Sequence, residues 1–181
     1  EIIGTSEELL KVSNFSDVII SNSDITITDP IGHAEAVLID GFNNLSGTLT
    51  IQQVEDSFSN IVLLDGIETI SIDSSEILVT DPIGLEEANL INPFSSNTIS
   101  LSELNDTLEN IIKTEALKPQ EDGIDGIDIS NAEIVLTDNI NSSDASLISD
   151  FTDNEITVST LTDKHLNISG TNAIPNIDLS D

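Results

Sequence analysis

The segment 25-ITITDPIGHAEAVLIDGFNNLSGTLTIQQVEDSFSNIV-62 decides the fold, because two further segments repeat its pattern. They are 77-ILVTDPIGLEEANLINPFSSNTISLSELNDTLENII-112 and 134-IVLTDNINSSDASLISDFTDNEITVSTLTDKHLNIS-169. A Thr-Asp pair marks the same point in each copy, at Asp29, Asp81 and Asp138, so the periods are 52 and 57 residues (81 − 29 and 138 − 81). Self-similarity at such periods is typical of repeat proteins.

The repeats predict the organisation of the whole 181-residue chain. We expect the following division: 1–16 as the end of a preceding repeat, 17–66 as repeat 1, 67–123 as repeat 2, 124–175 as repeat 3, and 176–181 as the start of a further repeat. The natural molecule is therefore expected to continue in at least one direction.

Within each copy the apolar period alternates between two and about three and a half residues, which predicts strands alternating with helices. Short strands are expected at 18–21, 69–73, 126–130, 25–28, 77–80, 134–137, 48–51, 98–101 and 155–158. Short helices are expected at 33–40, 85–91 and 142–149, and a second helix per copy along the stripes that begin at Val54, Leu104 and Leu161. Asp29-Pro30 and Asp81-Pro82 resemble helix starts, because Asp accepts hydrogen bonds from the first helical amides and Pro suits the first helical position.

Strands separated by helical crossovers pair in parallel, so the predicted fold class is α/β. We expect a repeat solenoid of short parallel strands alternating with short helices, with two strand-plus-helix coils of roughly 20–30 residues per repeat. Tandem all-β sandwich modules are the alternative, which the abundance of Ile, Val and Thr favours.

Charge excludes several functions, because 34 acidic residues face only 4 lysines and no arginine, for a net charge of −30. Nucleic acids and anionic membrane surfaces both require basic patches, so neither is an expected partner. The chain has no cysteine, which excludes thiolate and disulfide chemistry. No apolar run approaches the length of a membrane span, so membrane insertion is not expected.

Catalysis has little support in the sequence. His33 and His165 occupy non-equivalent repeat positions, and no nucleophile elbow is present, so we expect no enzyme. A carbohydrate-active enzyme with paired carboxylates is a minor alternative. A ligand- or ice-binding solenoid face is another, although the threonines of "ITIT" and "TLTI" are replaced in the other copies. Asn60, Asn110 and Asn167 recur, and we expect them to bind the backbone of neighbouring coils as a structural ladder.

Calcium is the cofactor that the composition favours, because Ca²⁺ takes oxygen ligands from Asp, Asn, Glu and carbonyl groups. One candidate set lies in the turn "QEDGIDGIDISN": Asp122, Asp125 and Asp128. The second set consists of recurrent acids at strand ends: Asp24, Asp29, Glu76, Asp81, Glu133 and Asp138. The alternative role for Asp29 and Asp81 is helix capping.

Three features of the repeats resemble a known family. They are the Thr-Asp pairs, the alanines Ala36, Ala88 and Ala145 with the leucine that follows each, and an Asn-Ile or Asn-Leu pair a few residues after a second Asp near the end of each copy. They are similar to the tandem repeats of very large secreted or cell-surface, RTX-adhesin-like proteins of cyanobacteria and other marine bacteria. The resemblance implies an extracellular, calcium-associated structural or adhesive module. The open ends of a solenoid are unpaired sheet edges, so the expected partners are neighbouring repeats or copies of the chain itself, with self-assembly into a surface layer or filament as a further expectation. Surface carbohydrate is another candidate partner. This chain departs from that family in carrying prolines and phenylalanines.

Overall fold

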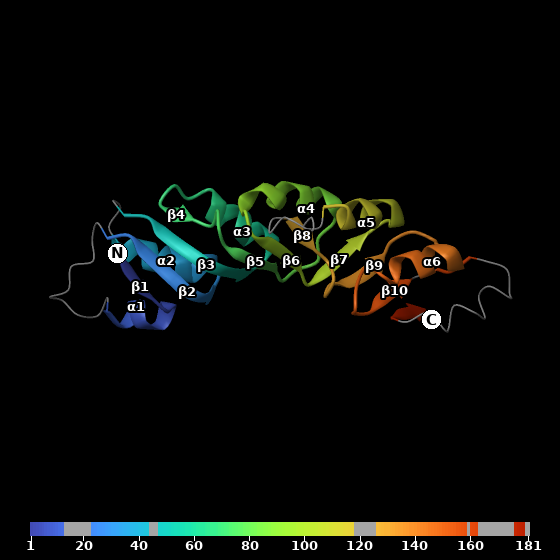
Figure 1. Cartoon of the computed structure of the whole chain (residues 1–181), viewed down its shortest axis with the longest axis horizontal. Coiled ribbons are helices and arrows are strands. Elements are labelled where there is room, and N and C mark those ends of the chain that lie inside the picture. Colours follow the sequence, from blue (N-terminus) through green and yellow to red (C-terminus); the bar gives the residue numbers. More distant parts are fainter. Residues whose placement is uncertain (13–22, 44–46, 118–125, 159, 163–175, 180–181) are drawn as a thin grey trace.

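The computed structural model describes residues 1–12, 23–43, 47–117, 126–158, 160–162 and 176–179. The molecule is elongated, with the strands succeeding one another along its long axis (Figure 1). The strands are β1 (Ile2–Gly4), β2 (Ile25–Ile31), β3 (Leu49–Asp56), β4 (Ile70–Ser71), β5 (Glu76–Val79), β6 (Thr98–Leu101), β7 (Glu103–Asp106), β8 (Gly126–Asp128), β9 (Glu133–Leu136), β10 (Ile156–Val158) and β11 (Ile177–Leu179). The helices are α1 (Ser6–Val12), α2 (His33–Asn43), α3 (Phe58–Asp65), α4 (Leu85–Ile91), α5 (Leu108–Glu115) and α6 (Ser142–Ile148), with a 3-10 turn η1 (Asn92–Phe94).

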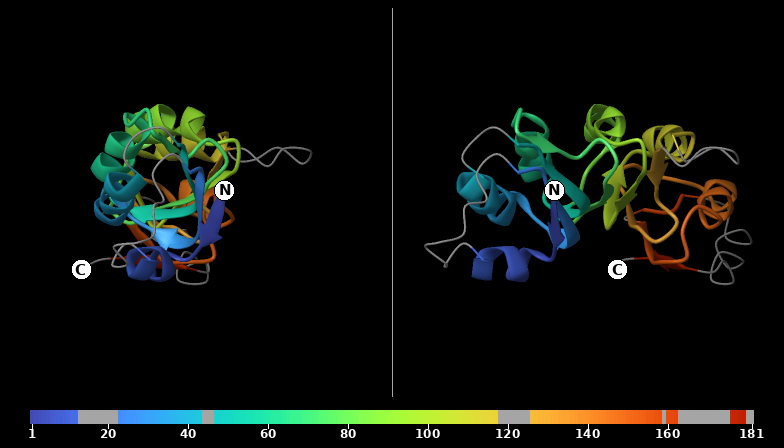
Figure 2. Two further views of the ribbon diagram at one scale, coloured as in Figure 1. Left: turned by 90° about the vertical axis from the view of Figure 1, so that its left-hand side faces the viewer. Right: turned by 60° about the vertical axis from the view of Figure 1, so that its left-hand side comes forward.

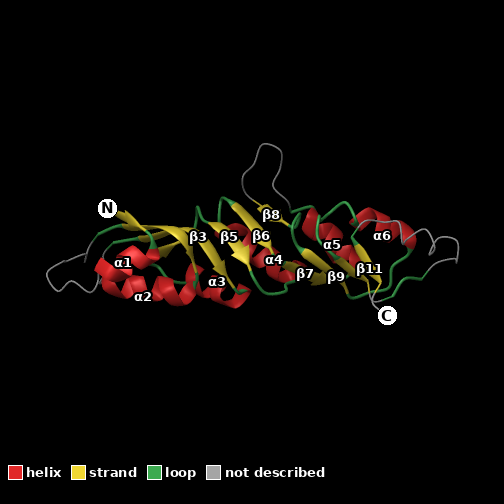
Figure 3. Ribbon diagram, turned by 90° about the horizontal axis from the view of Figure 1, so that it is seen from below, coloured by secondary structure: helices red, strands yellow, loops and turns green. Residues whose placement is uncertain are grey.

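All strand pairings between described residues are parallel. One sheet has the order β1-β2-β3-β5-β6-β8, with β4 also beside β3, and the other has the order β11-β10-β9-β7. Only Ser102 separates β6 from β7, and an isolated bridge joins Ile83 to Leu104, so the chain passes directly from the first sheet into the second. Figure 3 shows this succession of strands along the molecule.

The register gives the distance along the chain between neighbouring strands. Leu49 pairs with Ile70, and Leu104 pairs with Ile134, so neighbours are separated by between 21 and 30 residues (70 − 49 and 134 − 104). A helix lies between most neighbouring strands, and parallel pairing requires such a crossover. We call each passage through a strand, or a pair of consecutive short strands, and the following helix a coil. The 52-residue sequence period therefore contains two coils.

One face of the sheets packs against the helices. In β2, Ile25 and Ile27 are fully buried while Thr26 between them is partly exposed, as alternation along a strand requires. Viewed along the long axis, the helices form an arc outside the strands (Figure 2, left). The helices contribute buried residues three apart: Ala36 and Ile39, Ile61 and Leu64, Ala88 and Ile91, Ile111 and Thr114, Ala145 and Ile148. Alanine comes first in α2, α4 and α6, and isoleucine comes first in α3 and α5, which explains why the sequence repeats every second coil.

The prediction of α/β class with parallel strands is confirmed. The parallel pairing does not fit the alternative of sandwich modules, which are antiparallel. The strands expected at 25–28, 48–51, 77–80, 98–101, 134–137 and 155–158 are present and begin within one residue of the expected starts, but β2 and β3 continue three and five residues further. The helices expected at 33–40, 85–91 and 142–149 begin where expected, and α2 is three residues longer. Two more expected strands, 69–73 and 126–130, are present in shortened form as β4 and β8. The remaining one, 18–21, lies outside the described residues.

Two predictions of helix starts are wrong. Asp29 and Pro30 lie inside β2, where Pro30 pairs with Gln53, and the helix begins only at His33. Val54 and Leu104 lie in β3 and β7, and the following helices begin at Phe58 and Leu108. The apolar stripes are real, but each joins the last buried residue of a strand to the first turn of a helix.

No helix in the described part of the chain is long and apolar enough to cross a bilayer.

Candidate functional site

A row of aspartates joins each coil to the one before it, and we call this row the aspartate ladder. Each member accepts a hydrogen bond from the backbone N–H of the first residue of the helix in the preceding coil. The five bonds are Ser6 to Asp29 (2.7 Å), His33 to Asp56 (2.8 Å), Phe58 to Asp81 (2.6 Å), Leu85 to Asp106 (2.9 Å) and Leu108 to Asp138 (2.9 Å). The first amides of a helix have no partner within the helix, and they carry the positive end of its dipole. A carboxylate therefore suits this position.

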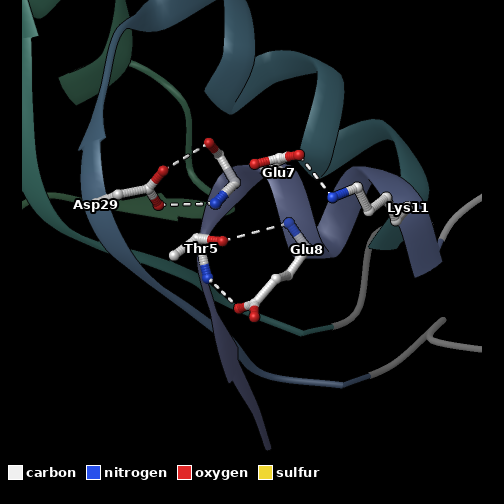
Figure 4. A network of polar contacts seen from close by, with 6 residues as sticks. Thr5, Glu7, Glu8, Lys11 and Asp29 are labelled. Atoms are coloured by element: carbon white, nitrogen blue, oxygen red, sulfur yellow. Dashed lines mark hydrogen bonds and ion pairs between the residues drawn. The ribbon is translucent and has the colours of Figure 1, made fainter.

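The first rung of the aspartate ladder uses both oxygens of Asp29 (Figure 4). Oδ1 accepts the backbone N–H of Ser6, and Oδ2 accepts its hydroxyl at 2.7 Å. Within the same turn, Thr5 N–H donates to Glu8 Oε2 at 3.0 Å, and Glu8 N–H donates back to Thr5 Oγ1 at 3.3 Å. The start of α1 is thus capped locally by Thr5 and Glu8, and between coils by Asp29.

Asp56 and Asp106 have additional partners in their own coils. Oδ1 of Asp106 accepts the N–H of Thr107 at 2.7 Å and the side-chain amide of Asn110 at 2.9 Å. Oδ1 of Asp56 accepts from Ser57 and Asn60 in the same way. Partial burial alone would raise the pKa of each carboxyl, but together the donated hydrogen bonds outweigh it and hold both pKa values below their ordinary range.

Glycine precedes two of these helices because the carboxylate of the next coil comes so close. A Cβ atom on Gly32 would lie 2.5 Å from Asp56 Oδ2, and one on Gly84 would lie 2.8 Å from Asp106 Oδ2. This close approach accounts for the glycine of "DPIG" in the first two copies. The third copy has Asn141 there, and its side chain accepts the N–H groups of Ser143 and Asp144.

A second set of contacts lies near the other end of the strands, and we call it the hydroxyl ladder. Its members are buried hydroxyls that donate to a backbone carbonyl of the preceding coil: Ser75 to Ile51 (2.5 Å), Ser95 to Ser75 (2.6 Å) and Thr152 to Ala132 (2.6 Å). Side-chain amides of Asn97, Asn154 and Asn176 add bonds to Ser74, Asn131 and Thr152. Both ends of the coil are therefore fastened to the coil before it.

The predicted ladder of Asn60, Asn110 and Asn167 is wrong for the two described members. Asn60 and Asn110 donate to Asp56 and Asp106 of their own coils, not to a neighbouring backbone. Asn167 lies outside the described residues. Asparagines do bond between coils, but at Asn97, Asn154 and Asn176, each of which lies just before a strand.

The predicted calcium ligands are distributed as follows. Asp122 and Asp125 lie outside the described residues, and Asp128 Oδ1 accepts the N–H of Ser130. Asp29, Asp81 and Asp138 belong to the aspartate ladder, and Asp24 Oδ1 accepts the N–H of Thr48. Glu76 and Glu133 are the exposed first residues of β5 and β9.

The structure does not bring the strand-end pairs together. Asp24 immediately precedes strand β2 and Asp29 lies within it, and five residues of extended chain span about 16 Å. Glu76 and Asp81, and Glu133 and Asp138, have the same separation in sequence. No group of three or more acidic or histidine side chains that could hold a metal ion occurs among the described residues. Calcium binding therefore stays a prediction, and the hydrogen bonds above are the observed role of Asp29, Asp81 and Asp138.

The sheet face away from the helices is the other candidate site. A hollow of about 440 Å³ opens over β3, β5 and β6, and we call it the sheet-face hollow. Its lining includes Gln53, Glu55, Glu76, Leu78, Thr98 and Ser100. Two carboxylates, an amide and two hydroxyls over an aliphatic floor can exchange hydrogen bonds with a polar, uncharged or cationic ligand.

Comparison with known proteins gives no relative. No protein-family model matches the chain, and neither a curated protein nor a solved structure matches it.

Proposed function

We propose that this chain is a structural and adhesive segment of a long extracellular surface protein, folded as a solenoid of stacked coils. The aspartate ladder is the observation that carries the proposal. Each of α1 to α5 has its first amide bound by a carboxylate from the following coil. A coil without its successor leaves that amide unpaired, so the unit suits a continuous rod better than an isolated domain.

The charge supports the same function. A net charge of −30 makes side-by-side copies repel each other, which keeps rods separate in solution. Salt screens this repulsion, so in saline surroundings the negative charge opposes the stacking of coils less than it does at low ionic strength. We also propose that Ca²⁺ adds to this screening, on the strength of the acidic composition and the turn that contains Asp122, Asp125 and Asp128.

Single-molecule stretching of the chain from its two ends tests the load-bearing part of the proposal. Coils held by nearest-neighbour contacts should detach one at a time. Each step should release roughly 25 residues, or about 80–90 Å of extended chain. A single rupture of the whole chain, or extension without resistance, would contradict a stacked rod.

The location needs its own experiment. Antibodies raised against the chain should label intact, unpermeabilised cells of the organism that encodes it. Labelling only after permeabilisation would contradict the extracellular assignment, while leaving the rod architecture standing.

A second candidate function is ligand binding, and the sheet-face hollow favours it. Its hydroxyl, amide and carboxylate groups suit a surface carbohydrate, whose hydroxyls both donate and accept hydrogen bonds. Calorimetric titration with a panel of neutral oligosaccharides tests this function. Binding that is lost in Glu76→Gln but kept in Glu35→Gln, on the opposite helical layer, would support it.

A further inference from the structure

Exposed leucines recur on the outer face of the helices, and we call them the aliphatic row. They are Leu38 in α2 (51% exposed), Leu63 in α3 (54%), Leu90 in α4 (52%) and Leu147 in α6 (48%). Each immediately precedes the second buried residue of its helix, so all four project to the same side of their helices. In α5 this position is Lys113, with the exposed Ile112 beside it.

Single exposed apolar residues are ordinary on protein surfaces, but a contiguous set indicates an interaction site. Helices α2 and α3, α3 and α4, and α4 and α5 pack side by side. Equivalent residues on packed neighbours are about 8–10 Å apart. The exposed leucines of α2, α3 and α4 therefore lie at equivalent positions on three helices that pack in succession, which places them in a row across the helices.

A hollow between α3 and α4 gives the aliphatic row a centre, and we call it the helix-face hollow. It has a volume of about 500 Å³ and is lined by Phe58, Glu86, Glu87, Asn89 and Leu90. Phe58 and Leu90 supply apolar walls, and the two glutamates supply negative charge. Glu87 Oε2 accepts the N–H of Gly84 at 3.1 Å, whereas Glu86 has no hydrogen bond or ion pair with another described residue.

Charge decides which partner fits. In the helix-face hollow, the carboxylate of Glu86, which has no counter-ion among the described residues, lies beside apolar walls. The hollow therefore suits an apolar side chain with a cation next to it. A second copy of this chain would bring another net charge of −30. Its described lysines, Lys11 and Lys113, are already paired with glutamates of their own helices. An anionic lipid surface would be repelled as well.

Spacing decides the shape of the partner. Residues seven apart on an α-helix lie on one face about 10.5 Å apart, close to the spacing of the helices in this layer. We propose that the aliphatic row and the helix-face hollow bind a basic amphipathic helix of a partner protein, laid across α2, α3 and α4. Its apolar residues at heptad spacing meet the leucines, and its lysines or arginines meet Glu86 and Glu87. This site is independent of whether the chain is a surface rod.

The test uses the full chain and a synthetic leucine–lysine helical peptide with leucines along one stripe. A matched peptide has the same composition, with its leucines distributed around the helix. Binding is measured by fluorescence anisotropy at low and high salt. The variants are Leu63→Ser with Leu90→Ser for the row, Glu86→Gln for the charge, and Ile3→Ser as a control, since Ile3 is 63% exposed on strand β1. Thermal unfolding confirms that each variant is folded.

We expect the striped peptide to bind more tightly than the matched peptide. The double leucine variant should weaken binding by roughly tenfold per leucine. Glu86→Gln should reduce both the affinity and its dependence on salt, and Ile3→Ser should leave binding unchanged. Equal binding of the two peptides, or unchanged binding to the double variant, would reduce the interaction to charge attraction and overturn the proposal. A self-association that the double variant abolishes, without peptide binding, would overturn it in favour of a second copy.

Discussion

Replacing Asp106 with alanine removes three hydrogen bonds that the aspartate ladder places on one side chain. Oδ2 accepts the N–H of Leu85 from the preceding coil at 2.9 Å, and Oδ1 accepts from Thr107 at 2.7 Å and from Asn110 at 2.9 Å. Loss of a capping side chain costs about 0.5–2 kcal/mol, and a hydrogen bond to a charged group makes a net contribution of about 1.5–3 kcal/mol. Because Asp106 is only partly buried, water recovers part of that loss. We expect a loss of about 2–4 kcal/mol in the free energy of unfolding.

The assay is urea unfolding followed by circular dichroism, with the thermal midpoint as a second measure. For a chain of this size, the loss corresponds to a midpoint lowered by roughly 5–12 °C. The control is Asp150→Ala, because Asp150 is exposed after α6 and bonds to no other described residue. Both variants remove one negative charge from a chain of net charge −30. Charge repulsion alone would make both neutral or stabilising.

Loss of the hydrogen bonds and relief of charge repulsion therefore predict changes of opposite sign in the free energy of unfolding. The aspartate ladder predicts that Asp106→Ala destabilises and Asp150→Ala does not. If the two variants unfold within about 0.5 kcal/mol of each other, the inter-coil hydrogen bonds contribute nothing measurable. In that case the argument for obligatory stacking would be refuted.

Further predictions concern pH, glycine, one unfavourable charge and calcium. Asp56 and Asp106 have pKa values below their ordinary range, so their contribution to the free energy of unfolding is complete above the pKa of the unfolded chain and is lost as the pH falls through the folded pKa. Unfolding measured below about pH 4 should show this loss of stability. The variant with both aspartates replaced by Asn should lose less stability over the same pH range. Gly84→Ala should destabilise by about 1–2 kcal/mol because its Cβ meets Asp106, whereas Gly41→Ala, in α2 with nothing within 4 Å, should stabilise by up to about 1 kcal/mol in urea unfolding. Burial and the charge of Asp73 raise the pKa of Asp65 at the C-terminal end of α3, so Asp65→Asn should raise the thermal midpoint slightly at pH 7. Millimolar Ca²⁺ should raise the midpoint above that in NaCl of equal ionic strength, and identical curves would refute specific calcium sites.

The order of strands and helices could be predicted because the local pattern determines it. Alternating residues such as those of 25–28 leave one face apolar, and the period changes abruptly at His33 and Leu85. Prediction failed at Val54 and Leu104, where the last buried strand residue happens to lie four residues before a helical apolar position. A strand followed by a short turn can thus imitate one helical stripe.

The aspartate ladder could be predicted only in part. The chemistry assigned to Asp29 and Asp81 was right, since each caps a helix. The helix was wrong, because Asp81 bonds to Phe58, 23 residues earlier, and local capping rules consider only the following residues. Asp56 and Asp106 were missed altogether. The recurring Asp-Ser/Thr-x-x-Asn of 56–60 and 106–110 is the signal that could have indicated them.

The aspartate ladder runs in one direction along the chain, so the coils are completed in order during synthesis. Every rung donates from an earlier helix to a later carboxylate, so a helix that leaves the ribosome waits for one more coil before its first amide is satisfied. Shortening the chain from its two ends is therefore not equivalent. Removal of N-terminal coils leaves a carboxylate that water solvates readily, whereas removal of C-terminal coils leaves a helix start that has only water in place of the carboxylate. Nascent chains should thus become resistant to protease with a lag of one coil behind synthesis.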